Sequence, residues 1–130
     1  MKKVLVLLLL MVSTSVFAEW TRVADTSDGD MTAYIDYGTI KKKNNKVQIW
    51  TLYDYKTVQQ VEKVRYLSQA SRMEYDCGEE TLRMLDMYWH SENMRTGEVI
   101  FSGTNFKYEA VSIVPGSVDE TLFNIACGKK

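Results

Sequence analysis

Residue types that perform acid–base, nucleophilic or metal chemistry are sparse in this chain of 130 residues. His90 is the only histidine, so a metal site built from several histidines is excluded, and no nucleophile-elbow motif accompanies it. Glu79 and Glu80 are adjacent, so in a strand they would point to opposite faces and could not act as an acid–base pair. The sequence therefore predicts no catalytic residues and a protein that is not an enzyme.

Two groups of residues contain potential metal ligands, and neither has the spacing of a metal site. Soft ligands that would suit Cu(I) in an exported protein occur at Met84, Met87, His90 and Met94. Alternation along a strand would separate position 87 from positions 84 and 90, so methionines that fill the core are the preferred interpretation. Aspartates gather near one turn, at Asp25, Asp28, Asp30 and Asp36. Their spacing does not match a calcium loop, so we expect no metal and no cofactor.

Side chains suited to binding are more plentiful. Four lysines, Lys41, Lys42, Lys43 and Lys46, form one basic cluster. It could meet a heparin-like polymer, an anionic lipid or an acidic protein, or it could be a charged hairpin tip that prevents edge-to-edge pairing. Trp20, Trp50, Trp89 and eight tyrosines supply aromatic surface, which is favoured at interfaces and also in strands. None of these residues can be assigned to a ligand from the sequence alone.

The N-terminus is typical of a secretory signal peptide. Lys2 and Lys3 precede an apolar run, Val4–Val12, which is shorter than the about 20 residues of a spanning helix. Cleavage is expected after Ala18, leaving residues 19–130 as a single domain with no integral membrane span. No cysteine follows the apolar run, so we expect a periplasmic, secreted or cell-surface protein without a lipoprotein anchor.

Charge and cysteine content indicate which partners and which covalent links to expect. Without Lys2 and Lys3 the chain keeps 14 basic and 17 acidic residues, a net charge of −3, which argues against a nucleic-acid partner. The two cysteines, Cys77 and Cys127, permit one pairing, and a disulfide is expected in an oxidising compartment. Closing a loop of about 50 residues would stabilise the fold by roughly 4 kcal/mol in the chain-entropy model.

Alternating apolar residues and turn signals predict an antiparallel sheet. The expected strands are Glu19–Asp25, Met31–Tyr37, Val47–Tyr55, Val61–Cys77, Thr81–His90, Glu98–Ser102 and Phe106–Val114. A change of parity within the fourth strand predicts a β-bulge or a bend near residues 68–71, and Asn44 and Asn45 predict a hairpin tip.

A short helix is predicted over Pro115–Cys127. Ser117 and Glu120 form a capping-box pattern, and Val118, Leu122 and Ile125 fall on one helical face. So short a helix requires a docking surface, and the disulfide would hold it against the sheet. The fold class is thus α+β, about six antiparallel strands with a C-terminal helix packed on one face. The opposite face and the edges would remain for recognition.

The order of several motifs resembles the surface-adhesin protein E family of Gram-negative bacteria. These motifs are Trp20, Tyr34-Ile35-Asp36, Val-x-Ile-Trp at 47–50, Glu74-Tyr75-Asp76-Cys77, Val114-Pro115-Gly116-Ser117, Glu120 and Cys127. The resemblance implies a six-stranded antiparallel sheet with a helix fixed to it by the Cys77–Cys127 disulfide. It also implies dimers, and binding of host laminin, vitronectin, plasminogen and haem, with no binding residue that can be transferred to this sequence.

The sequence and this resemblance together predict an exported, non-enzymatic binding protein. Its expected partner is a protein of the extracellular matrix or the cell envelope, recognised through the sheet, and a homodimer is compatible with the exposed edges. The alternative is a periplasmic binder of a small hydrophobic or haem-like ligand, with His90, a tyrosine or a methionine as an iron ligand.

Overall fold

The computed structural model describes residues 19–129, and the predicted signal peptide lies outside these residues. The strands and the helix within them are β1 Thr21–Asp25, β2 Met31–Lys43, β3 Lys46–Val61, β4 Val64–Asp76, β5 Thr81–His90, β6 Val99–Gly103, β7 Val111–Ser112 and α1 Val118–Ala126. The α+β class, the antiparallel sheet and the C-terminal helix are confirmed.

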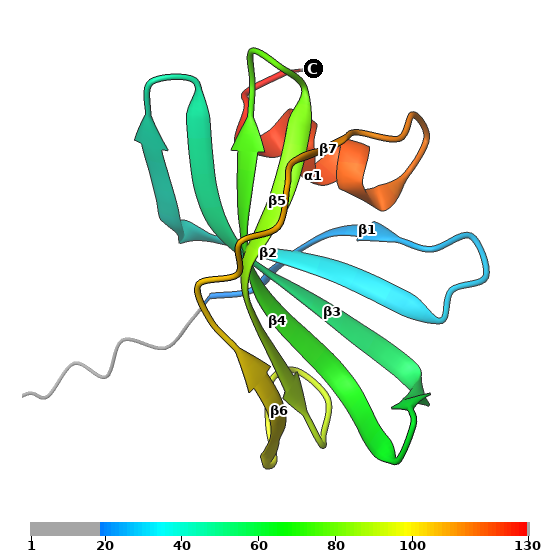
Figure 1. Ribbon diagram of the computed structural model, residues 1–130. Helices are drawn as coiled ribbons and strands as arrows, with labels where there is room; N and C mark the ends of the chain where they lie inside the picture. The colour runs from blue at the N-terminus through cyan, green and yellow to red at the C-terminus, as the bar shows by residue number, and fades with distance from the viewer. Residues whose placement is uncertain (1–18, 130) are drawn as a thin grey trace, which may run out of the picture.

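The sheet is an antiparallel meander in which neighbours in sequence are neighbours in space. Its order is β1-β2-β3-β4-β5-β6, and the two-residue β7 pairs with β5 beyond the end of β6. Figure 1 shows the tips of the β2–β3 and β4–β5 hairpins projecting from the same end of the sheet. Helix α1 lies across one face, where it contacts β1, β2 and β3.

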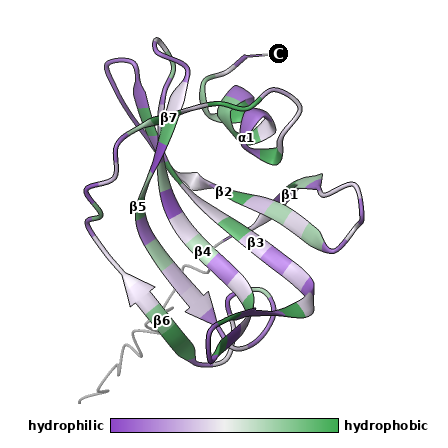
Figure 2. Ribbon diagram, turned by 45° about the vertical axis from the view of Figure 1, so that its right-hand side comes forward, coloured by the Kyte–Doolittle hydropathy of each residue, from purple (hydrophilic) through white to green (hydrophobic). Residues whose placement is uncertain are grey.

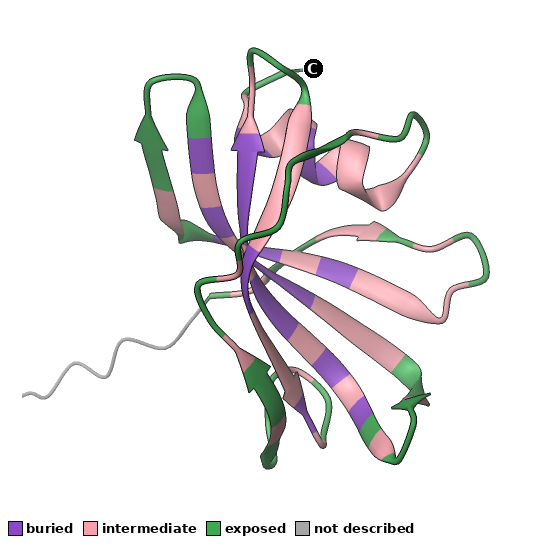
Figure 3. Cartoon of the chain, viewed as in Figure 1, coloured by how far each residue is buried: buried purple, intermediate pink, exposed green. Residues whose placement is uncertain are grey.

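The face of the sheet that α1 covers, here called the helix face, forms the main apolar core. Strands β2, β3 and β4 contribute Ala33, Ile35, Val47, Ile49, Met73 and Tyr75, and α1 contributes Leu122, Phe123 and Ala126. Buried segments lie in the middle of these strands and on the inner side of α1 (Figure 3). Phe123, which the predicted helical stripe omitted, packs edge-on against Tyr75 with ring centroids 6.2 Å apart. Because α1 is short, its stability depends on this contact surface.

The N-terminus of α1 is capped largely as predicted. Ser117 Oγ accepts a hydrogen bond from the Glu120 N–H at 3.2 Å. Glu120 reaches back to the N–H of Gly116, at 3.4 Å, rather than to that of Ser117. The Ser117 N–H instead donates to Val114 O. One half of the capping box is therefore present, and the other half is shifted by one residue.

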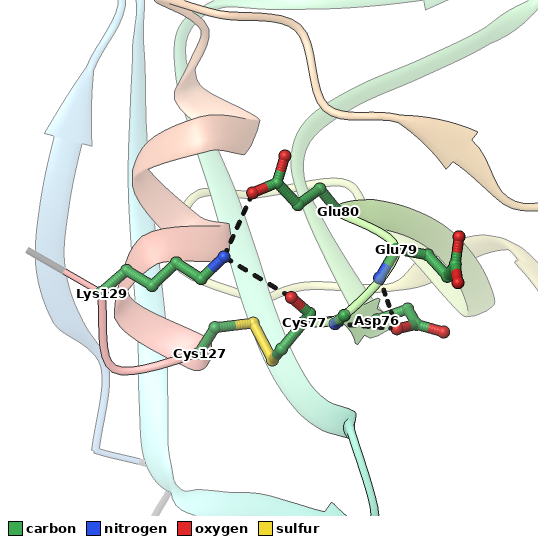
Figure 4. Close-up of a disulfide and its surroundings, with 7 residues drawn as sticks. Asp76, Cys77, Glu79, Glu80, Cys127 and Lys129 are labelled. Carbon is green, nitrogen blue, oxygen red and sulfur yellow. Dashed lines mark hydrogen bonds and ion pairs between the residues drawn. A yellow bond between two sulfur atoms is a disulfide. The ribbon is translucent and has the colours of Figure 1, made fainter.

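The C-terminus of α1 is tied to the β4–β5 turn. Cys77 and Cys127 form the predicted disulfide, with a Cα–Cα distance of 5.6 Å. Lys129 adds a second connection, because its Nζ lies 3.2 Å from Glu80 Oε1 and 3.5 Å from the Cys77 carbonyl oxygen (Figure 4). The same Nζ lies 5.0 Å from the centroid of the Phe123 ring. The last turn of the helix and the β4–β5 turn thus form one unit.

Four predicted element boundaries are wrong. Strand β3, which was expected to end at Tyr55, continues to Val61. The strand expected at Val61–Cys77 begins only after a tight turn at Glu62 and Lys63, where Glu62 has a left-handed φ of 55°. Strand β2 continues through Gly38 to Lys43, because Thr39 Oγ1 bridges an irregularity by accepting from the Trp50 N–H and donating to Asp36 O. The strand expected over Phe106–Val114 is reduced to β7.

The predicted bulge at residues 68–71 is also wrong, since β4 pairs regularly with β3 from residue 68 to residue 76. The irregularities lie in its partners. Residues 55–58 interrupt the register on β3, and Leu85 is the extra residue on β5. Because Arg72 pairs with Asp86 and Met73 pairs with Met84, the side chains of β5 exchange faces at Leu85.

Candidate protein-binding surface

The face of the sheet opposite α1, here called the polar face, carries a continuous row of polar side chains. Arg72 donates from Nε to Asp86 Oδ2 at 2.6 Å and from Nη1 to Gln48 Oε1 at 3.0 Å. Gln48 in turn donates to Glu74 Oε2 at 3.2 Å, and Arg83 Nε donates to Glu74 Oε1 at 2.8 Å. This ladder crosses β3, β4 and β5. It exists because the bulge at Leu85 brings both Arg83 and Asp86 to this face.

Both carboxylates of the ladder are buried but charge-compensated. The Arg72 guanidinium holds the pKa of Asp86 below its ordinary value, although burial opposes this, and the Asn105 N–H adds a hydrogen bond of 2.9 Å. Burial would raise the pKa of Glu74, but hydrogen bonds from Arg83 and Gln48 and the nearby cations lower it overall. Both groups are therefore ionised near neutral pH, and the ladder is a fixed array of alternating charges.

Aromatic side chains adjoin the ladder. Trp50 and Tyr88 lie with ring centroids 6.0 Å apart, and the guanidinium of Arg95 lies 5.4 Å above the Trp50 ring. Arg95 belongs to the β5–β6 loop, which folds over one end of the polar face. Two polar-face residues hold that loop: the Met94 N–H donates to Asp54 Oδ1 at 2.7 Å, and the Arg95 N–H donates to Ser68 Oγ at 3.0 Å.

At the opposite end of the polar face lies a groove of about 610 Å³ between the tips of two hairpins. Three of the four clustered lysines line it, together with polar and acidic residues. The lining residues are Lys41, Lys43, Asn44, Asn45, Lys46, Gln48, Glu74, Asp76, Gly78 and Glu79. The strand register explains this selection, because Lys42 pairs with the buried core residue Val47 and so belongs to the helix face.

The other tryptophans lie elsewhere. Trp20 is half-buried before β1, and Trp89 stacks on Tyr66 with centroids 4.3 Å apart. Trp89 also contacts Phe101 of the edge strand β6, a side chain that is 42% exposed. Figure 2 shows a hydrophobic segment in β6 at this edge. The aromatic residues noted in the sequence are thus spread over the polar face, the sheet edge and the helix face, where Tyr75 and Tyr53 lie in or against the core.

His90 does not fit the proposed haem site. Its side chain is on the polar face opposite Ser68 and is only 6% exposed. Among residues 19–129, neither Nδ1 nor Nε2 finds a hydrogen-bond partner. Burial, with the nearby charge of Arg95, lowers the pKa of His90. An iron ligand at this position would require the β5–β6 loop to open, so the geometry does not support haem ligation by His90.

The other potential ligands considered for a metal do not converge. The bulge places Met84 and Met87 on the same face, opposite Met73 and Ser71, so the parity argument made from the sequence is wrong. His90 nevertheless faces the other side. Asp25 binds Arg22 and Thr32, and Asp28 Oδ1 accepts hydrogen bonds from Thr26 and from the Asp30 N–H. Within the described chain, no group of three or more His, Cys, Asp or Glu residues could hold a metal ion.

The fold and this surface define a class: an α+β module with one face closed by a disulfide-tethered helix and the other carrying an ordered polar array. The surface-adhesin protein E family matches residues 20–128, so the chain belongs to that family. It is in these general terms an adhesin-like surface protein.

Solved structures share this fold. Crystal form II of Haemophilus influenzae protein E superposes with a TM-score of 0.62 at 16% identity, covering 88% of this chain and 91% of that chain. A second structure of Haemophilus influenzae protein E gives a TM-score of 0.60 at 17% identity, covering 88% of each chain. The protein from non-typeable Haemophilus influenzae gives 0.55 at 17% identity, with 88% and 79% covered.

No curated protein sequence matches the chain. Over residues 19–129, none of the helical segments has the length and apolar character needed to cross a membrane.

Proposed function

We propose that the chain is an exported, non-enzymatic binding protein that recognises a protein partner through the polar face of its sheet. In this proposal residues 1–18 direct export and residues 19–130 form the single binding domain. The partner is a protein of the extracellular matrix or of the cell envelope. The product is a periplasmic, secreted or cell-surface protein.

The polar ladder is the observation that supports this proposal. A row of five hydrogen-bonded side chains across three strands costs conformational freedom and desolvation, and it does not fill a core. What it provides is a rigid pattern of charge beside Trp50 and Tyr88, the residue types that dominate binding energy at protein interfaces. Helix α1 lies on the other face, so it leaves this pattern uncovered.

The proposal can be tested with purified residues 19–130 and immobilised laminin and vitronectin. We expect capture of the wild-type protein, and a loss of affinity of about tenfold or more for Trp50→Ala and for Tyr88→Ala, because such aromatic residues are typical hot spots. Phe101→Ala is the matched control, because Phe101 is an exposed aromatic residue of the edge strand β6 that packs on Trp89 rather than beside Trp50. Circular dichroism would establish that each variant is folded.

Two results would count against the proposal. One is failure of the wild-type protein to bind any tested matrix or envelope protein. The other is equal binding by the wild-type protein and the two polar-face variants while the control behaves normally. Protease treatment of intact cells would separately decide whether the protein is exposed at the surface.

A further inference from the structure

The groove at the hairpin tips has walls of opposite charge. Lys41 and Lys43 extend from β2 on one side, and Asp76 and Glu79 lie at the β4–β5 turn on the other. The floor between them is formed by the paired ends of β3 and β4, where Lys46 lies opposite Asp76 and Gln48 lies opposite Glu74. The two walls are thus about two strand spacings, or roughly 9.5 Å, apart.

The walls are held at a fixed separation. The Cys77 N–H of the acidic wall donates to Asn45 O of the lysine hairpin at 2.8 Å. Asp76 Oδ1 accepts from the N–H groups of Gly78 and Glu79, at 3.1 and 3.0 Å, which sets the shape of the acidic turn. The disulfide and Lys129 then join that turn to α1 (Figure 4). The groove is therefore preorganised, which lowers the entropic cost of binding.

The charges of the two walls are free for a partner, whereas those of the floor are not. Glu74 is occupied by Arg83 and Gln48, with Lys46 Nζ 4.0 Å away. In the part of the chain that the structure describes, Lys41, Lys43 and Glu79 take part in none of the salt bridges. A purely anionic ligand would face Asp76 and Glu79, and a purely cationic ligand would face the lysines.

We propose that the groove binds an extended peptide segment of the protein partner in which acidic and basic side chains alternate. Successive side chains of an extended chain point to opposite sides. In an alternating sequence, every acidic side chain can face Lys41 and Lys43 while every basic side chain faces Asp76 and Glu79. This inference rests on the proposed function and specifies the charge pattern of the partner.

The test uses two labelled synthetic peptides of identical composition. One alternates Glu and Lys over about eight residues, roughly 26 Å when extended, and the other arranges them as Glu-Glu-Lys-Lys repeats. By fluorescence anisotropy at low ionic strength we expect the alternating peptide to bind about tenfold more tightly, and the difference to shrink at about 0.15 M salt. Equal binding of the two peptides would overturn the inference, as would tighter binding of a heparin fragment than of either peptide.

Variants locate the site. Lys41→Glu combined with Lys43→Glu should abolish the preference for the alternating peptide and create binding of an all-lysine peptide, a gain that an unfolded protein would not mimic. Lys42→Glu combined with Lys63→Glu is the matched control, because it makes the same charge change at two exposed lysines that do not line the groove. If this control has the same effect as the Lys41 and Lys43 double variant, net charge rather than the groove determines binding, and the inference fails.

The two proposals can fail separately. Loss of the peptide preference alongside retained capture by matrix proteins that depends on Trp50 overturns only the charge pattern. A clear peptide preference in a protein that captures no matrix or envelope protein supports the groove and contradicts the proposed partner class.

Discussion

The two faces of the sheet are built on different principles. The helix face is apolar, and Leu122, Phe123 and Ala126 close it against β2, β3 and β4. The polar face is ordered by hydrogen bonds between side chains, with Arg72 shared between Asp86 and Gln48. Burial of apolar surface is non-directional, whereas charged hydrogen bonds require defined geometry. The helix face can thus supply stability while the polar face supplies a defined pattern for recognition.

This division limits the size of the apolar core in a chain of this length. With one face committed to polar groups, the main apolar core is limited to one side of the sheet, and cores of small domains are marginal. The disulfide between α1 and the β4–β5 turn compensates for that limit. Substitutions on the helix face should therefore have the largest effect on the free energy of unfolding. Substitutions on the polar face should mainly change its arrangement of charges and have a smaller effect on stability.

The largest effect is expected from removing the disulfide. Cys127→Ser should lower the free energy of unfolding by about 4 kcal/mol, because the bond closes a loop of about 50 residues in the unfolded chain. Urea denaturation measures the change, and limited proteolysis should cut first near α1. Cys77→Ser combined with Cys127→Ser is the control and should match the single variant. Unchanged stability and unchanged resistance to proteolysis would contradict the role given to this bond.

A smaller effect is expected from the polar ladder. Asp86→Asn should lower the free energy of unfolding at pH 7 by about 1–3 kcal/mol, since Asp86 binds both Arg72 and the Asn105 N–H. The pKa of Asp86 is lowered in the folded protein by Arg72, so its stabilising effect is complete above pH about 4 and declines as the pH falls further.

Denaturation curves recorded from pH 7 down to pH 2 check the sign of this effect. The wild-type protein should lose stability in the acid range more steeply than Asp86→Asn. Glu109→Gln serves as a control, since it removes an exposed carboxylate that takes part in none of the described salt bridges. Parallel acid profiles for the wild-type and Asp86→Asn proteins would show that the ladder does not contribute through its charge.

The smallest changes in the free energy of unfolding are expected for two tyrosines near α1. Tyr75 is fully buried, and its hydroxyl finds no partner among residues 19–129, whereas the Tyr53 hydroxyl donates to Asp119 Oδ1 at 3.0 Å. Tyr75→Phe should raise the free energy of unfolding by about 1 kcal/mol, and Tyr53→Phe should lower it by about as much. Thermal and urea unfolding of both variants provide the measurement. A change of the same sign in both would mean that hydrogen bonding does not separate them.

Much of the fold could be predicted because its signals are local. Ser117 and Glu120 mark the start of α1, Asn44 adopts the left-handed φ of 56° expected at a hairpin tip, and two cysteines permit one pairing. These features depend on residue type at fixed spacing, which a single sequence contains.

The features that were missed depend on pairing between distant strands. Glu62 adopts the left-handed turn conformation between β3 and β4 although no Gly, Asn or Pro is present, so the local sequence did not predict this hairpin. The bulge at Leu85 had a signal: apolar residues occupy even positions at Leu82 and Met84 and odd positions at Met87 and Trp89. That change of parity, read as a bulge in β5, would have predicted Arg83 and Asp86 on one face. The partners of those charges, Glu74 and Arg72, follow only from the register of β4.

The contact between Gly103 and Phe106 has a consequence for solubility. A Cβ on Gly103 would overlap the Phe106 ring, so glycine allows that ring to fold back over the end of β6, while the Phe106 N–H still donates to Leu85 O of β5 at 2.9 Å. The outer edge is thereby divided into β6, of five residues, and β7, of two, while the opposite edge is the five-residue β1 with its charged Arg22 and Asp25. Neither edge offers a long, flat template for another unfolded or partly folded chain. Such edges protect refolding at high concentration from strand-by-strand aggregation.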